Sequence, residues 1–416
     1  MTDAGTPASD GGHPAKTVPY GRAPRYGEEE LQELREALEQ GTLFYAQGKK
    51  VYALEAAFAA YVGARHAVTT TSGTASIHAA LIALGVAPGD EVITSPITDM
   101  GSVIPILFQG AAPVFADLDP RTYTMDPAAV EAAITPRTAA VVAVHLAGNA
   151  CNLDALQAVC ARHGVALIED CAQAFGCRYG ERFAGTIGRV GCFSFNEFKH
   201  ISCGDGGIVV TDDDELAARL RLATDKCYDR RPDAAIRNPS FLANNYRMTE
   251  LQAAVALAQL RKLEGILARR RSWCGRLMAA TADLPGLLPP TITPQCTPSW
   301  WFYMMRAAEG ANAHRTDQLA GALRAEGLPV GAHYIGQPVY EYPIFTSGSA
   351  FSRGEHAYQT HAYGRGLCPE AERILETCLI LSVNEAYTDQ DLEETIAGMH
   401  RAAAWAMAQD TPGDGA

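Results

Sequence analysis

The stretch AAVVAVHLAGNACNLDALQAVCARHGVALIED, residues 139–170, sets the pattern that decides the fold. It contains two short apolar runs, 139–146 and 165–170, and between them a segment from Asn152 to His163 with apolar residues at helical spacing. Continuous apolar runs of this length are typical of strands that are buried on both faces of a parallel sheet. The order strand, helix, strand therefore predicts an open, mainly parallel α/β sheet.

The same alternation continues on both sides of this stretch. Further strand-like runs lie at residues 91–95, 112–117, 191–195 and 207–212, and a further helical segment lies at 126–134. In such sheets ligands bind at the carboxyl ends of the strands. We therefore expect a site where the run 165–170 ends and where the run 191–195 passes into the chain that follows it.

The pattern changes in the last third of the chain. An amphipathic segment from Met248 to about Trp273 predicts a long helix at the junction of two domains. A proline-rich stretch, 284–294, follows it. Beyond lie strand-like runs at 300–306 and 331–335 and helical segments at Thr316 to Glu326 and Asp389 to about Met407. This mixture predicts a smaller α+β domain.

Length and composition complete the predicted organisation. The 416 residues are long enough for two domains, and we expect a disordered tail over 1–20, a large domain over 21–265 and a small domain over 266–410. The tail is rich in glycine, proline, alanine and polar residues and has no apolar core of a signal peptide.

Charge and cysteine content exclude several classes of protein. With 34 basic and 47 acidic residues the net charge is −13, whereas nucleic-acid binding needs clustered lysine and arginine. No apolar run approaches the roughly 18–20 residues of a membrane span. The eleven cysteines lack paired metal-ligand spacing. We therefore expect a cytoplasmic protein with free thiols, no metal site, no nucleic-acid partner and no membrane partner.

Polar residues gather at the predicted strand ends. Ser72, Gly73 and Thr74 open an apolar helix, where free backbone N–H groups could hold a phosphate, although these residues are also ordinary N-caps. Asp170 ends the run 165–170, with Gln173 one turn later. A buried carboxylate needs a cation or hydrogen-bond donors, either from a protonated cofactor ring or from a structural arginine.

A lysine follows the next strand. The stretch FSFNEFKHISCGDGG, residues 193–207, places Ser194 and Lys199 after an apolar run, and Asn245 and Arg247 precede the long helix. Most single lysines are solvated surface charges. Pyridoxal phosphate, however, needs a lysine amine, a carboxylate that keeps its ring nitrogen protonated, and donors for its phosphate. The combination predicts this cofactor.

A family resemblance supports the same interpretation. The motifs are TSGTASIHAALIALGVAPGDEVI, ITPRTAAVVAVHLAGNACNLDAL, VALIEDCAQAFG, FSFNEFKHISCGDGGIVVTDD and NYRMTELQAA. From about Tyr20 to Arg401 the chain resembles the DegT/DnrJ/EryC1/StrS family of sugar aminotransferases, which has the aspartate aminotransferase fold. The resemblance implies a large domain with a mainly parallel seven-stranded sheet flanked by helices, and a smaller C-terminal α+β domain.

The resemblance also implies roles for individual residues at the cofactor. Lys199 matches the lysine that forms a Schiff base with pyridoxal phosphate, and Asp170 matches the partner of the pyridine nitrogen. Gln173 matches the residue beside the cofactor ring and its 3-oxygen. The phosphate contacts are matched by Gly73 and Thr74, which follow Ser72, and by Ser194.

Further matches concern the neighbouring subunit and the substrate. An asparagine at the position of Asn245 reaches the phosphate of the neighbouring subunit, which implies a homodimer with shared active sites. His333 matches a histidine near the substrate pocket, but in a strand it could equally be a packed structural residue.

The chain departs from the family pattern at the cofactor ring. Members usually place an aromatic residue against the ring, whereas TSPITDMGSV, residues 94–103, has Asp99 and Met100 there. The thioether of Met100 could lie on the ring face instead. The loop near Lys226 and Tyr228 also lacks the His-Gly that often follows the corresponding helix.

The resemblance implies an aminotransferase that moves an amino group from L-glutamate or L-glutamine to a keto sugar, with pyridoxamine phosphate as the intermediate form of the cofactor. The acceptor could be a nucleotide-linked keto sugar, a keto-cyclitol or an aminoglycoside precursor in amino-sugar or antibiotic biosynthesis. One alternative is a dehydratase of the same family, but those relatives have a histidine in place of Lys199. Another is a non-catalytic regulatory relative.

Overall fold

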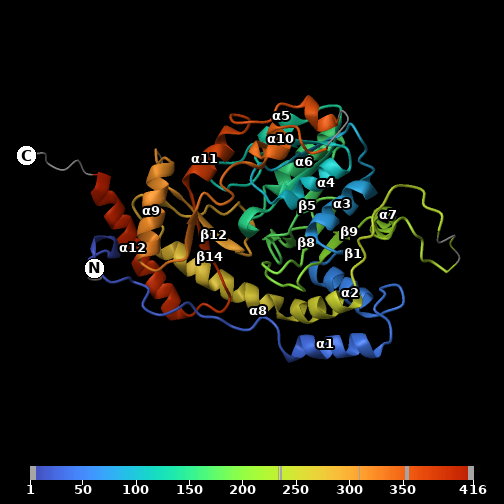
Figure 1. Ribbon diagram of the computed structural model, residues 1–416, viewed down its shortest axis with the longest axis horizontal. Coiled ribbons are helices and arrows are strands. Elements are labelled where there is room, and N and C mark those ends of the chain that lie inside the picture. The colour runs from blue at the N-terminus through green and yellow to red at the C-terminus, as the bar shows by residue number, and fades with distance from the viewer. Residues whose placement is uncertain (1–5, 233, 235–236, 309, 352–355, 411–416) are drawn as a thin grey trace, which may run out of the picture.

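The computed structural model describes residues 6–232, 234, 237–308, 310–351 and 356–410, and its largest sheet has seven strands flanked by helices (Figure 1). In spatial order the strands are β1 (His66–Thr70), β9 (Gly207–Thr211), β8 (Val190–Ser194), β5 (Ala166–Asp170), β4 (Thr138–Val144), β2 (Glu91–Thr94) and β3 (Ala112–Phe115). The strands β3, β2, β4, β5 and β8 pair in parallel, whereas β9 is antiparallel to both of its neighbours. The predicted mainly parallel α/β sheet is confirmed.

Helices cover this sheet, and all of them except α2, which precedes β1, and α7, which follows β9, come from the segments between its strands. They are α2 (Lys50–Val62), α3 (Gly73–Leu84), α4 (Ile104–Phe108), α5 (Pro127–Ala133), α6 (Leu153–His163) and α7 (Asp214–Thr224). The helix α3 packs on β8 and β9 and on the helices α4 and α7. Because it is enclosed in this way, ten of its twelve residues are buried, which explains an apolar sequence without a polar face.

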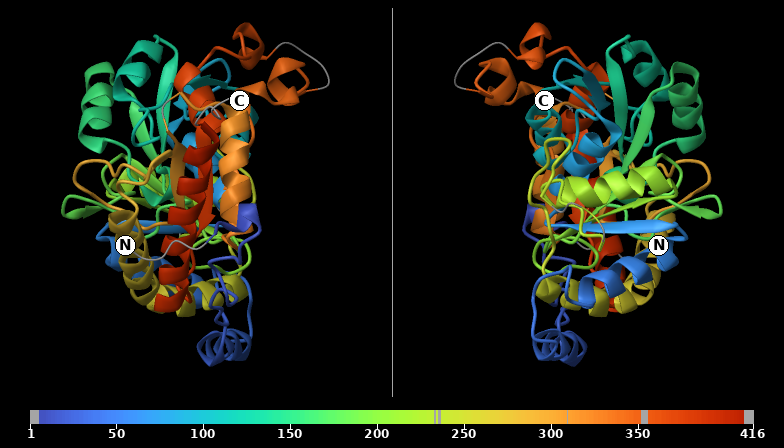
Figure 2. Two further views of the ribbon diagram at one scale, coloured as in Figure 1. Left: turned by 90° about the vertical axis from the view of Figure 1, so that its left-hand side faces the viewer. Right: turned by 90° about the vertical axis from the view of Figure 1, so that its right-hand side faces the viewer.

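A second, four-stranded sheet forms from the last third of the chain. Its order is β10 (Leu287–Leu288), β12 (Phe302–Ala307), β14 (Cys378–Ser382) and β13 (Val330–Ala332), with every pair antiparallel. The helices α9 (Ala313–Ala325) and α12 (Asp389–Asp410) pack side by side next to it (Figure 2). We call this sheet with α9, α11 (Pro369–Thr377) and α12 the small lobe.

The long helix α8 (Glu250–Ala280) joins the two parts. It packs against α1 (Glu28–Glu39) and α2 and also against α12, and in Figure 1 it runs along the lower part of the molecule, with α1 below it. Its Trp273 and Leu277 belong to the hydrophobic core of the small lobe. The predicted boundary after residue 265 lies inside this helix, and we keep the division into two domains as a proposal. None of the helices in the described ranges is both long and apolar enough to cross a membrane.

Short elements complete the chain. A three-stranded sheet has the order β11 (Cys296–Thr297), β6 (Arg178–Tyr179) and β7 (Arg182–Phe183). The remaining helical turns are η1 (Ala8–Asp10), η2 (Met100–Ser102), η3 (Leu146–Gly148), η4 (Val339–Glu341), α10 (Pro343–Thr346) and η5 (Ala357–Thr360).

The N-terminal segment differs from the expected disordered tail. Residues 1–5 lie outside the described residues, but residues 6–20 lie along the small lobe. The backbone N–H groups of Ala8 and Ala15 both donate to the buried carboxylate of Glu326, at 2.8 Å each. The ammonium of Lys16 lies 2.8 Å from Asp391 and 2.7 Å from Glu394. The composition predicts disorder because the segment has no hydrophobic pattern. The segment docks through polar contacts instead, and such a pattern does not reveal these contacts.

Candidate active site

The site lies where β5 and β8 end, as the sheet type predicts. Asp170 is the last residue of β5, and Lys199 lies in a turn a few residues after β8. The backbone of this turn is closed by a hydrogen bond from the Lys199 N–H to the Asn196 carbonyl, at 2.9 Å. The Lys199 ammonium nitrogen lies over the ring of Trp301, 3.9 Å from its centroid.

Two opposing effects act on the Lys199 amine. Burial lowers its pKa below the usual value, and the carboxylates of Asp170 and Asp99 act in the opposite direction. The net shift is downward, so a larger fraction of the amine is uncharged near neutral pH than in a solvated lysine. An uncharged amine is the form that attacks a carbonyl carbon.

Asp170 is held by donors on both of its carboxylate oxygens. Its Oδ2 accepts a hydrogen bond from the Ser102 hydroxyl at 2.6 Å, and its Oδ1 accepts one from the Ala172 N–H at 3.0 Å. Burial raises the pKa of Asp170, while the Ser102 hydroxyl, the Ala172 N–H and the charge of Lys199 lower it. Ser102 in turn contacts the Thr98 hydroxyl at 2.7 Å. Neither Thr98 nor Ser102 was predicted as a site residue, although both stand in the segment 94–103, which departs from the family pattern.

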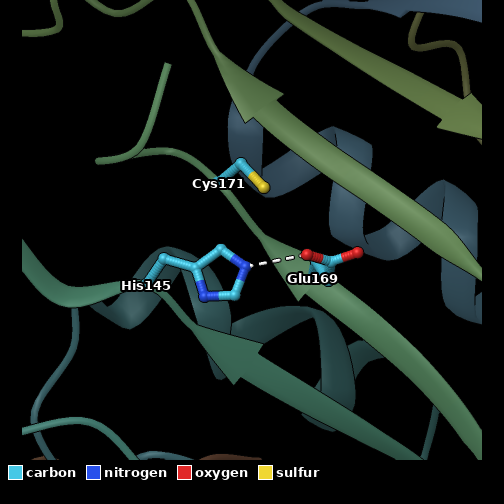
Figure 3. A group of neighbouring side chains, drawn as sticks. All are labelled: His145, Glu169 and Cys171. Carbon is cyan, nitrogen blue, oxygen red and sulfur yellow. Dashed lines mark hydrogen bonds and ion pairs between the residues drawn. The ribbon is translucent and has the colours of Figure 1, made fainter. Parts of the chain in front are cut away.

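Behind Asp170 lies a fully buried group of His145, Glu169 and Cys171 (Figure 3). The His145 Nε2 contacts Glu169 at 3.0 Å, and its Nδ1 accepts a hydrogen bond from the Cys151 N–H. Because Nδ1 accepts, the ring proton lies on Nε2 and is donated to Glu169. Figure 3 shows the imidazole directed at this carboxylate, with the Cys171 side chain nearby.

These residue types could ligate a metal ion, but their atoms are already used within the protein. Glu169 also accepts hydrogen bonds from the backbone N–H groups of residues 185, 187 and 188, at 2.6 to 2.7 Å. Burial raises the pKa of Cys171 to about 12, so this thiol stays protonated. The group therefore anchors the end of β5 beside Asp170. The absence of a metal site remains a prediction.

The N-terminus of α3 lies on the other side of the site. Ser72 is its N-cap, and its hydroxyl accepts a hydrogen bond from the Ala75 N–H at 3.0 Å. A Cβ atom on Gly73 would lie 2.7 Å from the Cβ of Ser194, so only glycine allows α3 to approach the end of β8 this closely. A Cβ atom on Gly101 would lie 2.6 Å from the Thr74 hydroxyl, which brings η2 to the same place.

These contacts form a continuous chain around one site. Lys199 is coupled electrostatically to Asp170, Asp170 is bonded to η2, η2 adjoins Thr74, and Gly73 adjoins Ser194. An amine, a buried carboxylate and a helix N-terminus are the groups that bind an aldehyde, a protonated ring nitrogen and a phosphate. The residues present therefore fit pyridoxal phosphate. Met100 packs partly buried against the core beside this site, and its place at the ring face remains a prediction.

The small lobe adds residues that the sequence analysis did not single out. Gln173 accepts a hydrogen bond from the Ala147 N–H at 2.8 Å, and its amide donates to the Tyr334 hydroxyl at 3.5 Å. Tyr334 follows β13, and Trp301 precedes β12. Both aromatic residues lie in runs whose pattern predicts only strands. Their approach to the large sheet depends on how the two parts of the chain pack, which no local pattern encodes.

Two histidines near these segments have structural partners. The His333 ring nitrogens contact the Leu375 carbonyl at 2.9 Å and the Asp317 carboxylate at 3.2 Å. This favours the structural reading of His333, while its role at a substrate remains a prediction. His200, next to Lys199, is fully buried, and its Nε2 contacts the Ser299 carbonyl at 3.0 Å. Burial holds the pKa of His200 well below its usual value, so the ring is neutral.

Asn245 and Arg247 are not among the residues described around Lys199 of the same subunit. Asn245 is exposed, and its side chain makes no hydrogen bond to any residue in the described part of the chain. Arg247 contacts the buried carboxylate of Asp225 at 2.5 Å, where Arg230 at 2.7 Å and the Tyr45 hydroxyl at 2.6 Å also meet it. Arg247 therefore has a structural partner, whereas the Asn245 amide is available to another molecule.

Comparisons with known proteins agree with this arrangement. The chain matches the sequence model of the DegT/DnrJ/EryC1/StrS aminotransferase family over residues 24–400. It is 35% identical over 390 residues to the spore coat polysaccharide biosynthesis protein SpsC of Bacillus subtilis (strain 168), a match that covers 91% of this chain and 95% of that protein.

Solved structures are similar over nearly the whole chain. The crystal structure of 3-amino-5-hydroxybenzoic acid (AHBA) synthase is similar with a TM-score of 0.82 and 29% identity, covering 95% of this chain and all (100%) of that one. The structure of DesV from S. venezuelae in complex with a ketimine intermediate is similar with a TM-score of 0.79 and 32% identity, covering 94% of this chain and 99% of that one.

Proposed function

This chain belongs to the DegT/DnrJ/EryC1/StrS aminotransferase family, and from that premise we propose that it moves an amino group from L-glutamate or L-glutamine to the keto group of a sugar or cyclitol. It is a pyridoxal phosphate-dependent aminotransferase. The finer proposal concerns the donor, the acceptor and the roles of individual residues.

The observation that carries the proposal is the half-buried amine of Lys199, which is coupled electrostatically to the buried carboxylate of Asp170. When bound, pyridoxal phosphate supplies a carbonyl group for exchange with amines and a protonated ring that accepts electrons. Asp170 would hold the proton on the ring nitrogen, since its oxygens retain acceptor capacity beyond the hydrogen bonds from Ser102 and Ala172. Gly73, Thr74 and Ser194 would hold the phosphate at the start of α3.

Lys199 would also act as the general acid and base. Its lowered pKa suits a group that would take a proton from the Cα of the amino donor and would later deliver a proton to the acceptor carbon that receives the amino group. The Trp301 ring against the ammonium nitrogen limits the access of water to it. Gln173, fixed by the Ala147 N–H, would lie beside the 3-oxygen of the ring.

A dehydratase of the same family is the second candidate, and one feature disfavours it. Such relatives have a histidine at the position of Lys199. The neighbouring His200 does not take that role, because its ring is fully buried and contacts the Ser299 carbonyl. A non-catalytic relative is distinguished by a simpler test, since it would neither bind the cofactor nor release a keto acid from glutamate.

We also propose a homodimer in which Asn245 of each subunit completes the phosphate site of the other. The exposed Asn245 side chain supports this. The acceptor class follows from the family's sugar chemistry, and the carboxylate of Asp99, whose charge acts on both Lys199 and Tyr334, favours an uncharged polyol such as a keto-cyclitol over a nucleotide diphosphate.

The proposal is tested by assaying the purified protein against a panel of keto sugars and keto-cyclitols with glutamate and glutamine. We expect equal amounts of keto acid and aminated product from the wild type, and none from Lys199→Ala. The matched control is Lys49→Ala, which changes an exposed lysine on another part of the surface. Full transamination by Lys199→Ala, or loss of a hydroxyl from the acceptor without transfer of nitrogen, would refute the proposal.

A further inference from the structure

The sulfur atoms of Cys177 and Cys296 are in direct contact, 3.6 Å apart. Cys177 follows the turn that carries Gln173 and is completely buried, whereas Cys296 begins β11 and is partly exposed. Pairing of β11 with β6 holds the two segments together, with Cys296 opposite Tyr179. Among the described residues, no other two cysteine sulfurs are found in direct contact.

The two thiols differ in their chemical environment. The Cys296 sulfur accepts a hydrogen bond from the Ala150 N–H at 3.2 Å, and it lies within hydrogen-bonding distance of the Cys177 sulfur, where either thiol could be the donor. The hydrogen bond from Cys177 lowers the pKa of Cys296, although burial opposes this. The same hydrogen bond, together with burial, raises the pKa of Cys177. Cys296 is therefore the thiol that ionises first, and it is also the one that solvent can reach.

Arg271 adds a positive charge between the two segments. Its guanidinium donates to the Gly176 carbonyl at 2.6 Å and to the Pro298 carbonyl at 3.0 Å, so that it joins the residue before Cys177 to a residue just after Cys296. A nearby fixed cation favours a thiolate over a thiol. The arrangement of one accessible, stabilised thiolate beside one buried thiol is that of an attacking and a resolving cysteine.

We propose that Cys177 and Cys296 form a redox-active pair that closes to a disulfide when a peroxide oxidises Cys296. The Cys296 thiolate attacks one oxygen of hydrogen peroxide, the O–O bond breaks, and with uptake of one proton the products are a sulfenic acid and water. The Cys177 sulfur then attacks the sulfenic sulfur, its proton leaves with the hydroxyl group as a second water, and the S–S bond forms. Peroxide gains the two electrons that the sulfurs lose.

The bond would connect segments that both reach the active site. Gln173 lies shortly before Cys177, and Trp301, which lies against Lys199, follows Cys296 after a short segment. Closing the bond requires the sulfurs to approach from 3.6 Å to the roughly 2.05 Å of a disulfide. Since the segments are already held by β6, β11 and Arg271, this is a local adjustment. A dithiol reductant reverses it by thiol–disulfide exchange.

The test uses the cofactor-loaded wild type, graded hydrogen peroxide, alkylation of the remaining thiols and peptide mapping without reduction. Trypsin places Cys177 in the peptide 163–178 and Cys296 in 277–306. We expect these peptides to be cross-linked, two hydrogen atoms lighter than their sum, and separated again by a dithiol. Since 163–178 also contains Cys171, the cross-link should persist in Cys171→Ala.

Variants separate the steps. In Cys177→Ser a sulfenic acid should be trapped on Cys296 by dimedone, and in Cys296→Ser the Cys177 thiol should remain free. Cys203 is the internal reference, because it is also partly exposed but burial raises its pKa to about 12. Oxidation of Cys203 before Cys296, or a cross-link that survives in Cys296→Ser, would overturn the proposal. Hydrogen exchange of residues 291–301 should also slow in the oxidised wild type.

Discussion

The docking of the N-terminal segment on the small lobe depends on Lys16. Its ammonium lies between the carboxylates of Asp391 and Glu394, at 2.8 and 2.7 Å, and the exposed fractions of the three side chains are 4%, 1% and 14%. The substitution Lys16→Met keeps most of the apolar stem and removes the charge. Asp391 and Glu394 are then left facing each other without a cation.

The expected effect on docking is large because these charges are buried. Removing one partner of a buried ion pair costs about 3–5 kcal/mol. A loss of about 3 kcal/mol corresponds to roughly a hundredfold change in the equilibrium between docked and undocked segment. Hydrogen exchange of residues 15–21 should report this change in docking directly. The Lys16 N–H donates to the Glu326 carbonyl at 3.0 Å, and the Gly21 N–H donates to the Asp391 carboxylate at 3.0 Å.

The effect should depend on pH in a defined direction. Although burial opposes it, the hydrogen bonds from Lys16 and from neighbouring groups lower the pKa of Asp391 to about 2, and those from Lys16 and Thr17 lower that of Glu394 to about 2. Carboxylates with lowered pKa stabilise the docked state above their usual pKa of about 4, and this stabilisation is lost as the pH falls toward 2. In Lys16→Met the unpaired carboxylates take up protons more readily, so the difference from wild type should shrink below about pH 5.

Hydrogen exchange measured by mass spectrometry at pH 7.5 and pH 4.5 checks both points. The exposed Lys49→Met is the matched control and should exchange like the wild type. A change in exchange of less than fivefold at pH 7.5, or an effect that grows as the pH falls, would refute this account of the segment.

Three further predictions concern the site. Asp170→Asn should weaken cofactor binding roughly tenfold to a hundredfold, because a hydrogen bond to a charged group is lost, and absorbance titration that gives an affinity within twofold of wild type would count against this role. Gly73→Ala should cost about 1–3 kcal/mol of stability or abolish cofactor binding, because the new Cβ would lie 2.7 Å from the Cβ of Ser194. The control is Gly275→Ala, whose new Cβ meets nothing within 4 Å. Equal thermal midpoints and equal cofactor affinities for the two variants would contradict this prediction. In the cofactor-free protein Lys199 should react with an acylating reagent at a lower pH than the other lysines, because burial lowers its pKa, and peptide mapping that finds it the slowest lysine at pH 8 would be inconsistent with that shift.

Much of the large sheet could be predicted from the sequence because each strand carries its own signal. The runs at 139–146 and 165–170 became β4 and β5 within a few residues, since strands buried on both faces are continuously apolar. By contrast, the helix predicted from Met248 to about Trp273 extends to Ala280. Its extension packs on the small lobe, and this tertiary contact is not visible in local periodicity.

The residues of the candidate site could be predicted when they lie in a local sequence motif. Residues that reach the site only because distant segments of the chain meet could not be predicted. Lys199 and Asp170 follow recognisable strand ends. Trp301 and Tyr334 lie next to strands of the other sheet, and only the packing of the two parts places them at Lys199 and Gln173. The docked N-terminal segment was missed for a related reason, because its contacts are hydrogen bonds and ion pairs to residues more than 300 positions away in sequence.

The central claim is that the amine of Lys199 holds the cofactor. Borohydride treatment of the cofactor-loaded protein reduces a carbon–nitrogen double bond between lysine and cofactor to a stable link, and trypsin then cannot cleave after the modified lysine. We predict that the cofactor mass is found on the peptide 190–219, which contains Lys199 as an uncleaved site, and that 190–199 disappears in proportion. A cofactor label on any other lysine, with 190–199 recovered in full, would contradict the account.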